Sequence, residues 1–197
     1  TLTSVGSAGD AFVTFSKTPA PGDQTYGDND PVVAEVTSST NLQIRVTAAN
    51  ATHVIYWQVV SFDDGTKISV QRGSTAGFTA GVTSLNVTLS AAANPAKSFV
   101  LVAETGAVGT FDDLGSGYVR GHLTTSTNLA LDRGASSGYA VPEVFWQVVT
   151  LNDGSSVQSG SATLNAGTLS SNTTVTAISL ARATAFASSQ FGGGLSA

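Results

Sequence analysis

The sequence predicts an all-β protein made of two similar antiparallel β-sandwich domains in tandem. Three observations support this prediction. Residues that favour strands occur in short alternating runs, turn residues separate these runs about every 8–12 positions, and long stretches of the chain occur twice. A repeat has to be recognised before a fold is assigned, because each copy is then expected to form the same unit. The spacing of strands and turns favours an immunoglobulin-like sandwich for each copy.

The repeat is clearest around Trp57 and Trp146, the only tryptophans of the chain. Each begins the tetrapeptide Trp-Gln-Val-Val, and they are 89 residues apart. Three other segments recur at a spacing of 87: residues 12–15 with 99–102, 36–42 with 123–129, and 70–73 with 157–160. We therefore expect one β-sandwich repeat in residues 1–97 and a second in residues 98–197.

The strongest predicted strand covers residues 54–62, and residues 144–151 are its counterpart. Alternation places the tryptophan and the first valine of each tetrapeptide on one face, which we expect to form the core. The opposite face is also apolar, which suits packing against a neighbouring domain or subunit. An Asp-Gly pair follows each strand and favours a tight hairpin. The residues expected in the core are Trp57, Val59, Trp146 and Val148.

Shorter β-branched runs predict the remaining strands, and Pro95 favours a loop over a helical turn in residues 90–96. Residues 175–186 match both 1–12 and 88–99, so about one strand of sequence remains after two repeats. This extra strand either completes the second sandwich, the favoured alternative, or pairs with a neighbouring subunit by strand addition. Strands are expected at residues 12–15, 32–36, 42–46, 68–71, 85–89, 99–103, 118–123, 129–131, 156–158 and 173–180.

Composition makes several classes of protein improbable. Charged residues are 11% of the chain, against about 25% in typical domains, and the net charge is −5. The eight Lys and Arg are scattered, so we expect no nucleic-acid partner. No apolar run reaches the roughly 18 residues of a membrane span, and there is no Cys for disulfides or thiolate sites. Since Thr1 is not Met, we expect that Met or a longer segment was removed ahead of it.

Acidic and amide side chains gather in residues 23–30. Asp23, Asp28 and Asp30 offer oxygen ligands of the kind that Ca²⁺ prefers. The EF-hand spacing is absent, however, and the counterpart loop keeps only two acidic residues. A solvated turn is therefore favoured over a calcium site, and no other cofactor is expected.

The sequence offers little for catalysis. His53 and His122 lie at the start of a predicted strand and inside another, outside any motif that activates a nucleophile, so we expect no enzyme. Aromatic side chains in or near predicted loops could contact a glycan; alternatively, they fill the ends of each sandwich or contact another subunit. These candidate contact residues are Tyr26, Phe78, Phe111 and Tyr139.

An aromatic residue, Trp-Gln-Val-Val, a short Asp-Gly loop and Val-Gln-x-Gly together resemble a β-sandwich repeat of bacterial and bacteriophage surface and structural proteins. Residues 57–73 and 146–160 carry the resemblance, although Ser61 and Thr150 stand where an acidic residue is usual. The resemblance implies a non-enzymatic structural protein at a virion surface, as capsid decoration or tail component, or in an extracellular filament. Its partners would be further copies or other surface structural proteins. The alternative is a carbohydrate-binding surface adhesin.

Overall fold

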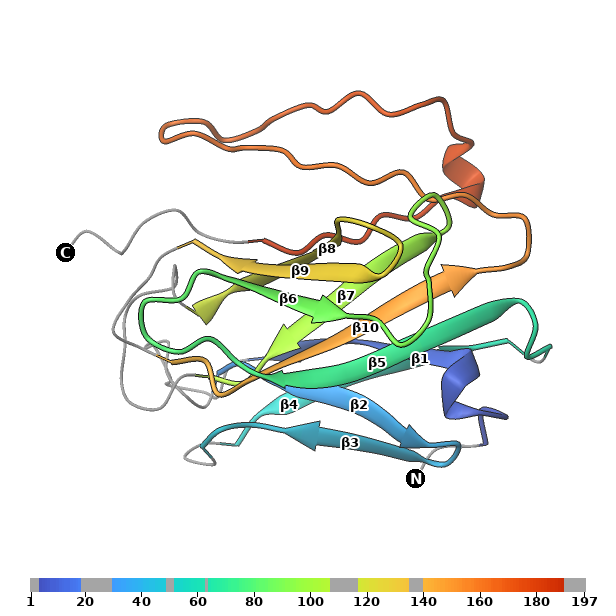
Figure 1. Cartoon of the computed structure of the whole chain (residues 1–197), viewed down its shortest axis with the longest axis horizontal. Helices are drawn as coiled ribbons and strands as arrows, with labels where there is room; N and C mark the ends of the chain where they lie inside the picture. Colours follow the sequence, from blue (N-terminus) through green and yellow to red (C-terminus); the bar gives the residue numbers. More distant parts are fainter. Residues whose placement is uncertain are drawn as a thin grey trace.

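The computed structural model describes residues 4–18, 30–48, 52–62, 64–106, 117–134 and 140–189. The structure is all-β, as the sequence predicts (Figure 1). No helix in these ranges is long and apolar enough to cross a membrane. The elements of the described ranges are η1 (Ala8–Asp10), β1 (Ala11–Thr18), β2 (Val33–Ser38), β3 (Asn41–Arg45), β4 (Val54–Ser61), β5 (Ile68–Ala76), β6 (Ser84–Thr88), β7 (Ser98–Glu104), β8 (Val119–Leu123), β9 (Asn128–Arg133), β10 (Glu143–Leu151) and η2 (Leu180–Arg182).

The strands form four small antiparallel sheets. β1 pairs with β4, and β2 pairs with β3. β10 lies between β5 and β7, while β9 lies between β6 and β8. The first two sheets, β1 to β4, are called the N-terminal unit below. The other two, β5 to β10, are called the C-terminal unit.

Each unit encloses an apolar cluster between its two sheets, so the architecture is sandwich-like. In the C-terminal unit, Leu129 and Leu131 of β9 face Trp146 and Val148 of β10, within a cluster that also contains Phe78. The cluster of the N-terminal unit is much smaller, and its buried members are Val13, Ala34 and Val36. The two units therefore differ in how much apolar surface they remove from water.

The two units share the same strand registers. Phe15 of β1 lies opposite Trp57 of β4, and Val102 of β7 lies opposite Trp146 of β10. The β2–β3 and β8–β9 pairs also match when the numbers are shifted by 87. The units differ because β5 and β6 add to β10 and β9 although they precede β7 in the chain. The domain boundary between residues 97 and 98 stays a prediction.

Side chains of the C-terminal unit fasten it to the N-terminal unit. Gln147 Nε2 donates to the carbonyl oxygen of Val13, and the Val13 N–H donates to Gln147 Oε1, each over 3.1 Å. The guanidinium of Arg72 on β5 donates to the carbonyl oxygens of Val36 and Ala11 over 2.5 Å each. The second face of β10 is thus packed against β1, as its apolar character led us to expect.

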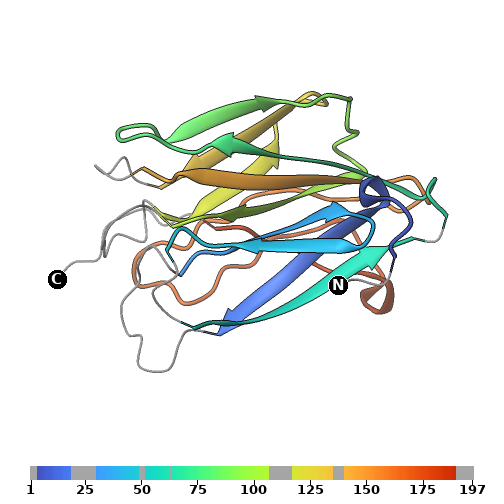
Figure 2. The same cartoon turned by 90° about the horizontal axis from the view of Figure 1, so that it is seen from below.

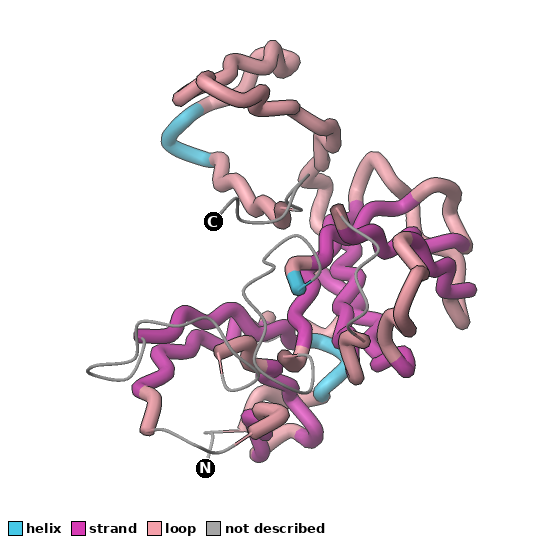
Figure 3. Tube along the Cα trace, turned by 90° about the vertical axis from the view of Figure 1, so that its left-hand side faces the viewer, coloured by secondary structure: helices cyan, strands magenta, loops and turns pink. Residues whose placement is uncertain are grey.

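Residues 152–189, called the C-terminal arm below, leave the sheets after β10. Within this range no residue is in a strand, and nearly all residues are exposed. The arm runs out beyond the strands and returns, which is clear in Figures 1 and 3. Gln158 ties the outgoing and returning stretches together: its Nε2 donates to the carbonyl oxygen of Thr176 over 3.1 Å, and the Thr176 N–H donates to its Oε1 over 2.6 Å.

Candidate functional site: the exposed edge of β4

β4 is an edge strand of its two-stranded sheet. Among the described residues its backbone pairs with β1 alone, and in Figure 2 it crosses the lower part of the view beside β1. Apolar side chains along it are exposed: Tyr56 by 67% and Trp57 by 43%, together with Val54 and Val60. An unpaired strand edge with apolar side chains is a template for pairing with another chain.

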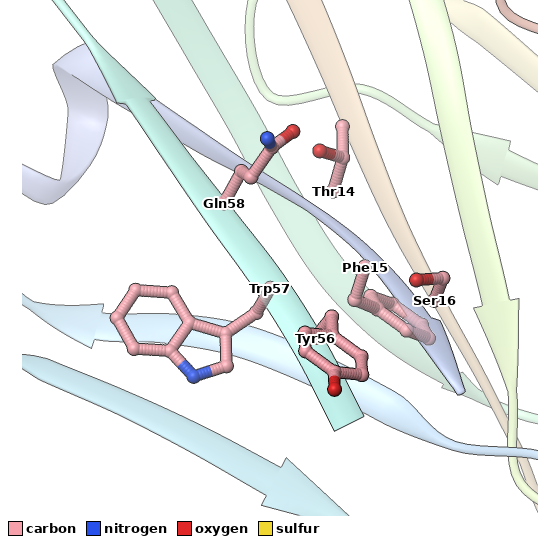
Figure 4. A pocket seen from close by; sticks show the side chains of 6 residues that line it. All are labelled: Thr14, Phe15, Ser16, Tyr56, Trp57 and Gln58. Carbon is pink, nitrogen blue, oxygen red and sulfur yellow. The ribbon is translucent and has the colours of Figure 1, made fainter. Parts of the chain in front are cut away.

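A shallow hollow of about 360 Å³ lies over β1 and β4. Figure 4 shows Trp57 and Tyr56 leaving β4 in different directions, with the polar ends of Thr14, Ser16 and Gln58 nearby. The surroundings therefore offer aromatic surface, hydroxyl groups and one amide. These groups suit stacking and hydrogen bonding rather than proton transfer. The lining residues are Thr14, Phe15, Ser16, Tyr56, Trp57 and Gln58.

The counterpart of Trp57 in the C-terminal unit is covered. Trp146 is only 8% exposed, because β5 lies on the edge of β10 that is free in β4. A Cβ on Gly73, the residue opposite Trp146, would lie only 2.8 Å from the indole Cζ2. The indole therefore rests against the backbone of β5, and a residue with a side chain does not fit at position 73 without displacing it.

Three of the four predicted core residues pack against apolar clusters. Trp146 and Val148 are buried in the cluster of the C-terminal unit, and Val59 is partly buried against the cluster of the N-terminal unit. In the single chain Trp57 departs from the expected core position, because no strand of the described ranges covers the outer edge of β4.

Phe78 is not a surface contact residue, and its burial fits the alternative that it fills the sandwich. Its side chain is 0% exposed and belongs to the C-terminal cluster, with the guanidinium of Arg133 5.1 Å from its ring centroid. The other three predicted contact residues lie outside the described residues. They are Tyr26, Phe111 and Tyr139.

Of the predicted calcium ligands, only Asp30 lies within the described residues. Its Oδ1 is 3.0 Å from Lys17 Nζ, so this carboxylate has an ion-pair partner. Asp23 and Asp28 lie outside the described residues. Across the part of the chain that the structure describes, no group of three acidic, His or Cys side chains could hold a metal ion.

The two histidines lie on different units. His53 directly precedes β4, while His122 Nδ1 on β8 is 3.6 Å from Asp132 Oδ2 on β9. A strongly perturbed acid lies elsewhere: burial raises the pKa of Glu104, at the end of β7, to about 8. Lys17 holds the matching position of β1, with Asp30 beside it.

Sequence reasoning identified β4 as the strongest strand but missed its free edge. The signal lay in the repeat itself, since residues 157–160 match residues 70–73 of β5. Because β5 pairs with β10 of the C-terminal unit, it cannot also pair with β4, and the edge of β4 stays free. Comparisons with protein-family models, with curated proteins and with solved structures found no match to this chain.

Proposed function

We propose that this chain is a non-enzymatic structural protein that self-associates through its sandwich-like units. Its place would be the outer surface of a bacteriophage virion, as capsid decoration or tail component, or an extracellular filament. The observation that supports this most is the free edge of β4, where Trp57 is 43% exposed while its counterpart Trp146 is covered. A large exposed aromatic on an unpaired edge is stabilised when a partner covers it.

The proposal includes a common origin of the two units as tandem copies of one immunoglobulin-like module. Three things favour this: the repeated tetrapeptide, the shared register of β1–β4 and β7–β10, and the shared register of β2–β3 and β8–β9. Two copies of one module give a surface protein two similar units for assembly, and assembly needs no catalytic site. The low share of charged residues, 11%, suits a surface that packs against further copies.

The test is the mass of the protein in solution over a range of concentrations. Light scattering should show masses above that of one chain at high concentration, and Trp57→Ser should shift the distribution toward monomer. Ser126→Ala, in an exposed loop of the C-terminal unit, is the matched control and should behave as the parent. A parent protein that stays monomeric at every concentration contradicts self-association. Electron microscopy of native particles labelled with an antibody tests the location.

A carbohydrate-binding adhesin is the second candidate, and one observation favours it. Tyr56 and Trp57 expose aromatic surface next to Gln58, and such surfaces stack on the apolar faces of sugars. On a glycan array this candidate predicts binding that Tyr56→Ala weakens at least tenfold. Absence of binding, or binding that survives Tyr56→Ala, Tyr26→Ala and Tyr139→Ala, removes it.

A further inference from the structure

β5, the strand that covers Trp146, has a counterpart in the C-terminal arm that is not paired with any strand of the described residues. β5 lies on β10, and the sequence repeat places residues 155–163 of the C-terminal arm in correspondence with residues 68–76 of β5. In the single chain these arm residues are in no strand and are largely exposed. The single chain thus has a free strand edge on β4 and, separately, a segment whose counterpart is a strand.

We propose that residues 156–163 of one copy add as an antiparallel strand to the free edge of β4 in a second copy. The proposal rests on the self-association proposed above and names its contact. Main-chain hydrogen bonds along the edge would supply affinity, and the side chains that face the tryptophan would supply the register.

The register follows from the C-terminal unit. There Trp146 lies opposite Gly73, Val148 opposite Gln71 and Thr150 opposite Ser69. Transferring these pairs through the repeat gives the contacts expected between two copies. They are Trp57 with Gly160, Val59 with Gln158 and Ser61 with Ser156.

Gly160 is the most informative residue of the arm. No described part of the single chain requires a glycine there: a Cβ at this position would have no described atom within 4 Å, and the backbone is not in the left-handed region. At the matching position, Gly73 is needed because the Trp146 indole lies against it. A glycine at 160 acquires the same purpose when Trp57 of another copy lies against it.

The arm contains the same pair of glutamine hydrogen bonds that is found at β5. Gln71 Nε2 donates to the carbonyl oxygen of Ala91, and the Ala91 N–H donates to Gln71 Oε1, each over 2.9 Å. Gln158 makes the same two hydrogen bonds with Thr176. Gln71 of β5 and Gln158 of the arm therefore bind the segment that follows them through the same pair of hydrogen bonds. This arrangement lowers the entropy that the arm loses on binding.

The contact joins unlike surfaces, because the arm follows β10 and the acceptor edge belongs to β4. After one contact forms, the pair still has one unused β4 edge, on the copy that gave its arm, and one unused arm, on the copy that accepted it. Such a heterologous contact continues as a filament, or closes as a ring if the rotation between copies allows it.

Engineered disulfides test the contact directly, because the chain has no cysteine of its own. Ser61→Cys combined with Ser156→Cys should give covalent dimers and larger species on non-reducing gels. Thr150→Cys with Ser69→Cys is the matched control: these residues are opposite one another within the chain, so the bond should leave the mass of a monomer. A bond within one chain, or no bond, in the Ser61–Ser156 variant overturns the proposal.

Gly160→Val supplies a second readout that does not depend on thiols. Because position 160 is exposed in the single chain, the variant should melt as the parent does but associate at least tenfold more weakly. Ser170→Val, at an exposed position of the arm outside the contact, should change neither. If the parent assembles while Gly160→Val assembles equally well and no cross-link forms, self-association stands and this contact is wrong. If the parent is monomeric throughout, both proposals fail.

Discussion

β4 and β10 contain the same Trp-Gln-Val-Val tetrapeptide in different surroundings. In β10 both strand edges are paired, Trp146 is 8% exposed, and Gln147 is hydrogen-bonded to the backbone of β1. In β4 one edge is free, Trp57 is 43% exposed, and Gln58 is exposed. The difference shows that the burial of a strand depends on which segments pack against it. β10 is buried because β5 pairs with one of its edges and β1 packs on its second face.

The largest effect is expected from removing the covered tryptophan. Trp146→Ala leaves a cavity in the main apolar cluster and should lower the free energy of unfolding by about 3–5 kcal/mol. Trp57→Ala, measured at a concentration where the protein is monomeric, should lower it by about 1 kcal/mol or less, since much of that side chain already contacts water. Denaturant unfolding of both variants measures this difference. Equal losses of stability would show that the two strands are equally buried in solution.

The glutamines give a smaller contrast of the same kind. Gln147→Leu removes both hydrogen bonds to Val13 and leaves its N–H and carbonyl buried without these partners, which should cost about 1–3 kcal/mol. Gln58→Leu replaces an exposed side chain and should change stability by about 0.5 kcal/mol or less. Thermal melts of the two variants make the comparison. A neutral Gln147→Leu would mean that β10 and β1 are not fastened through this side chain.

The stability of the protein should depend on pH because of Glu104 on β7, whose matching position on β1 is held by Lys17. Burial raises the pKa of Glu104 from an ordinary value of 4.5 to about 8, so the folded state keeps this proton where the unfolded chain has released it. This contribution to stability is complete below about pH 4.5 and is lost as the pH rises through 8.

Unfolding measured at several pH values between 5 and 8 tests this. The parent should become less stable as the pH rises, and Glu104→Gln should flatten that slope. Lys17→Met, at the matching position of β1, is the control and should leave the slope unchanged. A parent whose stability is independent of pH in this window would contradict the assignment.

Local features were predictable from the sequence because they depend on neighbouring residues. Alternation around Trp146 correctly indicated a strand with two apolar faces. After β10, Gly154 is in the left-handed region at φ +93°, and the Ser155 N–H donates to Asp153. The hairpins expected after the two tryptophan strands do not form, because no residue of 152–189 is in a strand and β5 pairs with β10 instead of β4. The partner of β5 was not predictable in this way, because it follows from contacts about 75 residues apart along the chain, such as Trp146 with Gly73.

The candidate site was only partly predictable for the same reason. The sequence left Phe78 either at a contact surface or inside the sandwich, and its burial depends on Arg133, which lies 55 residues further along the chain. The repeat indicated an unused strand near the C-terminus without showing that β4 has the free edge. That edge became visible only once β5 was seen on β10.

The most direct measurement is the fluorescence of Trp57 alone. Trp146→Phe leaves Trp57 as the only tryptophan, so its emission reports the edge of β4. In dilute solution we expect red-shifted emission that acrylamide quenches readily. As concentration rises and copies associate, the emission should shift to the blue and quenching should weaken, and adding Gly160→Val should abolish both changes. Association that leaves Trp57 emission and quenching unchanged would contradict the claim that a second copy covers this strand.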